Sequence, residues 1–310
     1  MYGQFLVIFA LMATGYFFRK INVTSDEMNR GLNKFIVYFS FPCFIFYKVA
    51  SLEIDSGFFM EFLLASGLSA ALFLIFGLYA FWYAKIRRFP VEGAGSAETM
   101  MVFPNNAFMG FPIAHIFFGD MGLLFMLASN IAMNLTLFSY GVFSLRRNDG
   151  KKRLSLAGFA KCFLNPNILA LAFGLLFYGL NVDMPEAAAT YLMYIGSICT
   201  PMAMICIGST LVGTNVLKVV RNNTVLESVI NKNLVLPALA YSMLAPAPLP
   251  KMMKATIVFA NGFPSAAVAS ALVAAEGKDG ALACEILVVS TAVSVVSIPL
   301  LVKLINMLIL

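Results

Sequence analysis

Two short polar segments interrupt strongly apolar stretches of the sequence, and both combine proline, glycine and asparagine. Residues 103–112 read Phe-Pro-Asn-Asn-Ala-Phe-Met-Gly-Phe-Pro, and residues 261–265 read Asn-Gly-Phe-Pro-Ser. Proline and glycine at this density exclude an uninterrupted helix. The N-terminal ends of the resulting half-helices carry unpaired amides and a positive dipole end, which favour an anionic group such as a carboxylate.

The polar and helix-breaking residues of these two segments form the predicted substrate-binding set. Its members are Asn105, Asn106, Gly110, Pro112, Asn261, Gly262, Pro264 and Ser265. Neither segment contains a charged residue, so anion recognition within them would depend on amides and helix ends. The alternative is that the prolines only kink the helices while the asparagines bond one helix to another.

Coupling to an ion or a proton would need further polar groups, and four residues could supply them. Asn130 and Asn134 offer amide oxygens to a cation such as Na+. His115 and Glu98 are the nearby groups that could carry a proton. Each of the four also has a simpler structural interpretation, as an interfacial residue or a link between helices.

Enzymatic chemistry finds little support in the sequence. There is no nucleophile-elbow, zinc-protease or phosphate-loop pattern, and the chain has a single histidine. The five cysteines lack the spacing of metal ligands. We therefore predict no catalytic residues, no metal site and no cofactor beyond a coupling Na+ or H+.

The composition indicates the environment in which these segments must work. Of the 310 residues, 61% are apolar and only 12% are charged, about half of the ~25% that is usual in soluble domains. So few polar residues cannot cover a water-soluble globule of this size. The sequence predicts an all-α integral membrane protein in contact with the lipid bilayer. Its net charge of +6 forms no patch for nucleic acid.

A membrane helix needs about 20 apolar residues, and the chain provides ten such stretches. They lie near residues 2–18, 32–50, 58–84, 97–117, 121–145, 162–180, 187–213, 229–247, 253–275 and 280–307. In alternate connections between them we count 17 of the 21 Lys and Arg residues, Lys232 among them. Because positive charge marks the cytoplasmic side, both termini are predicted to be extracytoplasmic, in a multi-pass protein of the cell membrane.

The most basic connection, residues 146–161, divides the ten spans into two sets of five, residues 1–145 and 162–310. An odd number of spans makes the second set enter the membrane from the opposite side, so an inverted repeat is geometrically available. Gly-Phe-Pro occurs in the fourth span at residues 110–112 and in the ninth at residues 262–264. This agreement at equivalent positions favours two inverted five-helix repeats with broken crossover helices.

These segments resemble the auxin efflux carrier family, which includes plant PIN carriers and bacterial malate and malonate permeases. Residues 104–112 match its first crossover segment, and Pro264 stands where its second crossover proline is expected. The segments 165–170, 202–208 and 274–276 are similar to its sixth span, its seventh span and the stretch that follows the second crossover. The resemblance covers essentially the whole chain.

The resemblance implies a fold related to bile acid–sodium symporters and sodium–proton antiporters. It implies a homodimer, a scaffold made of spans 1, 2, 6 and 7, and a moving transport domain made of spans 3–5 and 8–10. It places Asn105, Asn106, Pro112 and Pro264 at the crossover site.

We accordingly expect a secondary active or facilitative transporter of small organic anions, such as malate or malonate, that works by an elevator-type motion. The alternatives are a sodium-coupled symporter of larger amphipathic anions and a membrane sensor that does not transport.

Overall fold

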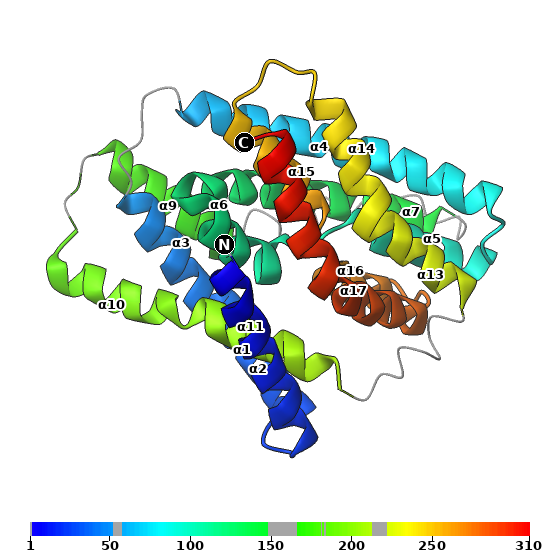
Figure 1. The fold of residues 1–310 in the computed structure, drawn as a ribbon, viewed down its shortest axis with the longest axis horizontal. Coiled ribbons are helices and arrows are strands. Elements are labelled where there is room, and N and C mark those ends of the chain that lie inside the picture. Colours follow the sequence, from blue (N-terminus) through cyan, green and yellow to red (C-terminus); the bar gives the residue numbers. More distant parts are fainter. Residues whose placement is uncertain (1, 52–57, 148–165, 181, 183, 213–221) are drawn as a thin grey trace. The chain divides into compact units, whose positions relative to one another are not determined.

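The computed structural model describes residues 2–51, 58–147, 166–180, 182, 184–212 and 222–310. Within these ranges the regular structure is helical, apart from one isolated antiparallel bridge (Figure 1). The chain divides into two compact units. The first unit comprises Met1–Phe58 and Ala160–Gly213, and the second comprises Phe59–Phe159 and Thr214–Leu310.

The first unit is built from short and medium-length helices. They are α1 (Tyr2–Lys20), α2 (Asp26–Phe35), the π-helix η1 (Ile36–Ser40), α3 (Phe41–Ala50), α9 (Pro166–Gly179), α10 (Glu186–Ser197) and α11 (Cys199–Thr210).

Glycines bring α1 and α11 together at backbone distance. A Cβ added to Gly15 would collide with the carbonyl of Ile205, and one added to Gly208 would collide with the carbonyl of Met12. Small residues allow such close helix approach in membrane proteins, where van der Waals packing drives helix association. The two reciprocal contacts therefore make α1 and α11 a tightly joined pair.

Replacement of Gly208 by valine is expected to lower the melting temperature of the detergent-solubilised protein. Overpacking of this kind costs about 1–3 kcal/mol, which corresponds to a fall of roughly 2–10 °C. Gly31→Ala is the control, because a Cβ at Gly31 meets nothing within 4 Å. Equal melting temperatures for Gly208→Val and the control would contradict the close packing of the two helices.

The second unit contains the longest helices. They are α4 (Phe58–Ile86), α5 (Val91–Val102), η2 (Asn106–Gly110), α6 (Phe111–Thr136), η3 (Leu137–Gly141), α7 (Val142–Arg146), α13 (Asn223–Ile230), η4 (Asn231–Val235), α14 (Leu236–Leu244), α15 (Lys251–Asn261), α16 (Ala267–Ala275) and α17 (Gly280–Leu308).

Prolines follow π-helical turns in a repeated arrangement. Pro42, Pro112 and Pro237 each occupy one of the first two positions of an α-helix that follows η1, η2 or η4. A proline has no N–H and its ring crowds the carbonyl four residues earlier. At each of these three positions the preceding turn is π-helical, a rare geometry within α-helices, and the helix continues past the proline. Pro112 thus continues its helix, contrary to the expectation that it interrupts the first polar segment, and the interruption lies at residues 103–105.

Among the described residues, four helical segments are long and apolar enough to cross a membrane. They are Phe59–Ile86, Asn106–Arg146, Glu186–Thr210 and Gly280–Leu308. The second of these reverses its path at Gly119, whose φ of 66° suits glycine, at the boundary predicted between the fourth and fifth spans. Each of the ten predicted stretches overlaps helical elements, but α2, α5 and α13 begin about six residues before the stretches predicted for them. Residues 162–165 and 213 of these stretches lie outside the described residues.

Candidate substrate site

Two interrupted helices of the second unit carry the predicted substrate site. Helix α5 ends at Val102 and η2 begins at Asn106, while α15 ends at Asn261 and α16 begins at Ala267. The sequence therefore located both interruptions correctly. Each leaves the last carbonyls of one half-helix and the first amides of the next without intrahelical partners.

The two interruptions pair with each other through their backbones. The Asn105 amide donates to the Pro264 carbonyl over 2.8 Å, and the Ala266 amide donates to the Phe103 carbonyl over 2.9 Å. These bonds flank an antiparallel bridge between Pro104 and Ser265. Backbone groups freed by the breaks are thus satisfied inside the protein, as an apolar environment requires.

Ser265 fastens this pairing to the helices around it. Its hydroxyl donates to the Met100 carbonyl over 2.6 Å, and its amide donates to the hydroxyl of Ser290 on α17 over 3.1 Å. The side chain is fully buried. In this structure Ser265 therefore links three elements, and its contact with a substrate stays a prediction.

Lys232, on η4, reaches the same place from a third element. Its ammonium donates to the Val102 carbonyl over 3.2 Å and lies 3.5 Å from the Asn261 carbonyl. These carbonyls belong to the last residues of α5 and α15, and the lysine side chain is fully buried. A positive charge at the C-terminal ends of two helices complements both helix dipoles.

Lys232 is not among the predicted site residues and is counted with a cytoplasmic connection, whereas the structure places it on η4 with its side chain buried. The reason is that Lys232 lies near the end of an apolar stretch, where a basic residue normally marks the membrane surface. A usable signal was present, because Lys232 lies inside the predicted span 229–247 between Asn231 and Asn233. A charged residue within a span is a functional candidate by default.

Asn105 presents a donor at the start of the second half-helix. Its Oδ1 caps η2 by accepting from the Phe108 amide over 3.3 Å. Because an amide donor fixes that oxygen, the Nδ2 group must point elsewhere. The side chain is half-buried, so this amide nitrogen can donate to a bound carboxylate.

Asn106 and Asn261 present acceptors instead. The Asn261 Nδ2 donates to the Ile257 carbonyl over 2.9 Å, and the Asn106 Nδ2 contacts the Ser129 hydroxyl over 3.4 Å. Their Oδ1 atoms are buried without a partner among the described residues. Buried acceptors suit a donor or a cation better than a carboxylate, which departs from the role predicted for both residues.

Gly110 and Gly262 lie where other side chains pack closely. A Cβ on Gly110 would come within 3.0 Å of the Met126 sulfur, and one on Gly262 would collide with the side chain of Leu301. The absence of a side chain at Gly110 thus allows η2 to pack closely against α6. At Gly262 it allows the end of α15 to pack closely against α17.

The proposed cation residues Asn130 and Asn134 lie one turn apart on α6 and are both buried. The Asn134 Nδ2 donates to the Asn130 carbonyl over 3.0 Å. Asn130 keeps its Oδ1 without a partner in the described part of the chain. Asn130 follows Ser129, which contacts Asn106, so this strip adjoins the first interruption.

The two proposed proton carriers both have ionic partners. The His115 Nε2 lies 2.9 Å from Asp120 Oδ1, across the reversal at Gly119. Glu98 is buried on α5, where Arg147 forms two bonds of 2.5 and 2.7 Å to its carboxylate and Ser144 donates to it over 2.8 Å. Both side chains are thus already engaged within the protein.

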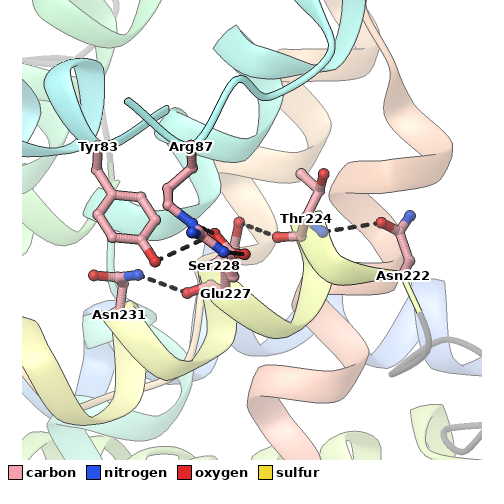
Figure 2. A network of polar contacts seen from close by, with 7 residues as sticks. All are labelled: Tyr83, Arg87, Asn222, Thr224, Glu227, Ser228 and Asn231. Atoms are coloured by element: carbon pink, nitrogen blue, oxygen red, sulfur yellow. Dashed lines mark hydrogen bonds and ion pairs between the residues drawn. The ribbon is translucent and has the colours of Figure 1, made fainter. Parts of the chain in front are cut away.

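A polar network joins α4 to α13 immediately before Lys232, and Figure 2 shows its side chains converging. Arg87 forms two bonds of 2.9 and 2.5 Å to the Glu227 carboxylate, which also accepts from the Tyr83 hydroxyl over 3.2 Å. The Asn231 Nδ2 donates to the Glu227 carbonyl over 2.7 Å, and its Oδ1 accepts from the Tyr79 hydroxyl. The network thus positions the residue that precedes Lys232.

Glu227 makes the strength of this network dependent on pH. Its hydrogen bonds from Arg87 lower the pKa of the carboxyl group below its ordinary value. A carboxyl group whose pKa is lower in the folded state stabilises the fold above its unfolded pKa, and the contribution disappears as the pH falls through the folded pKa.

We expect Glu227→Gln to melt about 1–3 °C below the unsubstituted protein at neutral pH. The difference should vanish as the pH falls below about 4. Glu285→Gln is the control, since no ion pair of Glu285 occurs in the described residues. A difference that grows on acidification would contradict the assigned pairing.

Two pockets of the second unit are lined by described residues. One, of about 450 Å³, is lined by Glu92, Ser144, Lys278 and Asp279 among others. The other, of about 240 Å³, is mostly apolar and is lined by Asn233, Tyr241 and Leu304 among others. Neither of these two pockets includes the paired residues 103–106 or 262–266 in its lining.

Several apolar helices together with two interrupted helices paired at their breaks define a multi-pass membrane transporter. The sequence matches the family described as membrane transport protein over residues 1–302. The chain belongs to this family, the auxin efflux carrier family.

Similar chains come from archaea and bacteria. An uncharacterized transporter of Methanothermobacter thermautotrophicus is 22% identical over 299 residues, which cover 95% of each chain. One of Methanocaldococcus jannaschii is 25% identical over 210 residues, covering 66% of this chain and 67% of its own. The uncharacterized transporter YfdV of Escherichia coli K12 is 23% identical over 218 residues, covering 67% and 68%.

Proposed function

We propose that this protein carries small organic anions, with dicarboxylates such as malate or malonate as the leading class, across the cell membrane. Membership of a transporter family supports transport. The choice of an anion depends on the chemistry of the paired interruptions.

The pairing of the two breaks is the observation that carries this proposal. It brings the first turns of η2 and α16 next to one backbone bridge. The positive dipole end carried by the first amides of a helix favours an anion, also where amides such as that of Asn106 already have acceptors in the protein. Asn105 adds a side-chain donor at the same position. The buried Lys232 adds positive charge without occupying those amides, so the paired breaks combine donors with a positive potential.

The division of the chain into two units supports an elevator-type mechanism. The unit formed by Met1–Phe58 and Ala160–Gly213 contains predicted spans 1, 2, 6 and 7, whereas the other contains spans 3–5 and 8–10 and both interruptions. A moving unit that holds the whole substrate site and a scaffold that holds none of it suit such a motion. We propose that the scaffold unit also forms a homodimer, which cross-linking in membranes would test.

Counterflow in proteoliposomes tests the proposed function directly. Vesicles are loaded with unlabelled malonate, malate or indole-3-acetate. They are then diluted into a buffer that contains a trace of the same anion in labelled form. We expect at least one of these carboxylates to accumulate above protein-free vesicles, and taurocholate serves as the larger amphipathic probe. Accumulation of taurocholate alone would favour the alternative substrate class, and no accumulation of any organic anion would refute the proposal.

A further inference from the structure

Lys232 occupies a position that has the chemistry of a cation site. It contacts the last carbonyl of α5 and the last carbonyl of α15. In transporters with discontinuous helices, unwound carbonyls and half-helix C-terminal ends are the groups that coordinate a coupling cation. Here a covalently attached ammonium group is bound by groups of that kind.

Neighbouring oxygens add to the acceptor character of this position. Asn261 contributes not only its carbonyl but also an Oδ1 that is buried without a described partner. Carbonyl, amide and hydroxyl oxygens are the ligands that hard cations prefer. Removal of the ammonium would therefore leave the Val102 and Asn261 carbonyls without the positive partner that they have in this structure.

A purely structural role is the main competing explanation for Lys232. In that case the lysine would only bond the ends of α5 and α15, and a neutral donor could do the same. Burial of an ammonium is costly unless negative potential compensates it, and two helix C-termini supply such potential. The choice of a charged rather than a neutral donor therefore favours an electrostatic role.

We propose that the ammonium of Lys232 is a built-in cation that takes the place of a diffusible Na+ at the paired interruptions, so that transport proceeds without Na+. This inference rests on the proposed anion transport for its functional consequence. Its structural part, the replacement of a cation by a tethered lysine, does not require the anion to be identified.

Removal of the ammonium should open the site to Na+, and two variants separate the possibilities. Lys232→Ala removes the charge and leaves space, whereas Lys232→Met removes the charge and fills the space. Lys254→Ala is the matched control, because Lys254 also donates to two carbonyls, those of Ala245 and Ala247, but at a more exposed site.

The first measurement compares the melting temperature in NaCl with the melting temperature in choline chloride. Exchange of about 150 mM choline chloride for NaCl should raise the melting temperature of Lys232→Ala by roughly 2–4 °C, as expected for a ligand that binds only the folded state. The unsubstituted protein, Lys232→Met and Lys254→Ala should not respond. A binding measurement with radioactive 22Na+ should show the same pattern, with retention by Lys232→Ala and not by the other three proteins. If Lys232→Ala does not fold, Lys232→Ser takes its place.

Several outcomes would overturn the inference. One is 22Na+ binding by the unsubstituted protein at the level of the alanine variant. Another is a folded Lys232→Ala or Lys232→Ser that does not respond to Na+, which would make the lysine a structural link. The unsubstituted protein can be measured whether or not a variant folds, so the test does not depend on the variants alone.

Malonate counterflow provides the functional measurement. The unsubstituted protein should transport equally in Na+ and choline, while Lys232→Ala should lose at least ~10-fold in choline and recover part of this in Na+. Transport by the unsubstituted protein that stops in choline would overturn the inference. Absence of counterflow for every carboxylate would refute the proposed function, while Na+ binding by the alanine variant would still support the tethered cation.

Discussion

Arg147→Met is expected to destabilise the second unit more than any other single substitution considered above. Arg147 neutralises Glu98 through two hydrogen bonds, and the Glu98 side chain is only 1% exposed. Removal of one partner from a buried pair leaves an uncompensated charge and costs about 3–5 kcal/mol. The melting temperature in detergent should fall by roughly 6–15 °C.

The double variant Glu98→Gln/Arg147→Met is the critical control, because it removes both charges together. It should recover most of the lost stability. Arg146→Met provides a matched comparison, since Arg146 also forms a bidentate pair, with Glu276, but the Glu276 side chain is 15% exposed. The model of a buried charge pair fails if Arg146→Met is as damaging as Arg147→Met, or if the double variant is no more stable than Arg147→Met.

Asn105→Asp is expected to abolish most anion transport while the protein stays folded. Aspartate caps a helix as well as asparagine does, so its carboxylate can still accept from the Phe108 amide. The substitution replaces the free amide donor by a negative charge, and this charge repels an anionic substrate. Loss of a donor and repulsion of the anion together should slow malonate counterflow by ~100-fold or more.

Asn105→Ser separates the contribution of the cap from that of the donor. Serine also caps the helix, but its short side chain carries no amide group. We expect an intermediate, roughly 10-fold loss of counterflow and a melting temperature close to that of the unsubstituted protein. Normal transport by Asn105→Asp would remove Asn105 from the substrate site while leaving the fold untouched.

Prediction from sequence succeeded where local chemistry is decisive. The helix interruptions at residues 103–105 and 262–266 follow from proline and glycine in apolar stretches, and both are present. Pro112 does not mark a break, because it lies in the first turn of α6 directly after a π-turn. Such a turn depends on packing of the whole segment, and its position cannot be read from the proline alone.

The roles of individual site residues were harder to predict because they depend on partners distant in sequence. Ser265 binds the carbonyl of Met100, which is 165 residues away. Asn261 directs its donor to its own helix and thus presents only an acceptor. A sequence shows that serine and asparagine have hydrogen-bonding groups, but the folded chain decides which of those groups remain available.

The sequence alone determined the membrane class, the family and the two positions where helices must break. These properties depend on apolar content and on the backbone limits of proline and glycine, which act locally. Only the tertiary structure decided that the two breaks pair with each other and that Lys232 contacts the C-terminal ends of both preceding helices. Burial and the field of two helix ends arise only when elements distant in sequence pack together, and this packing makes Lys232 a charged residue of the interior.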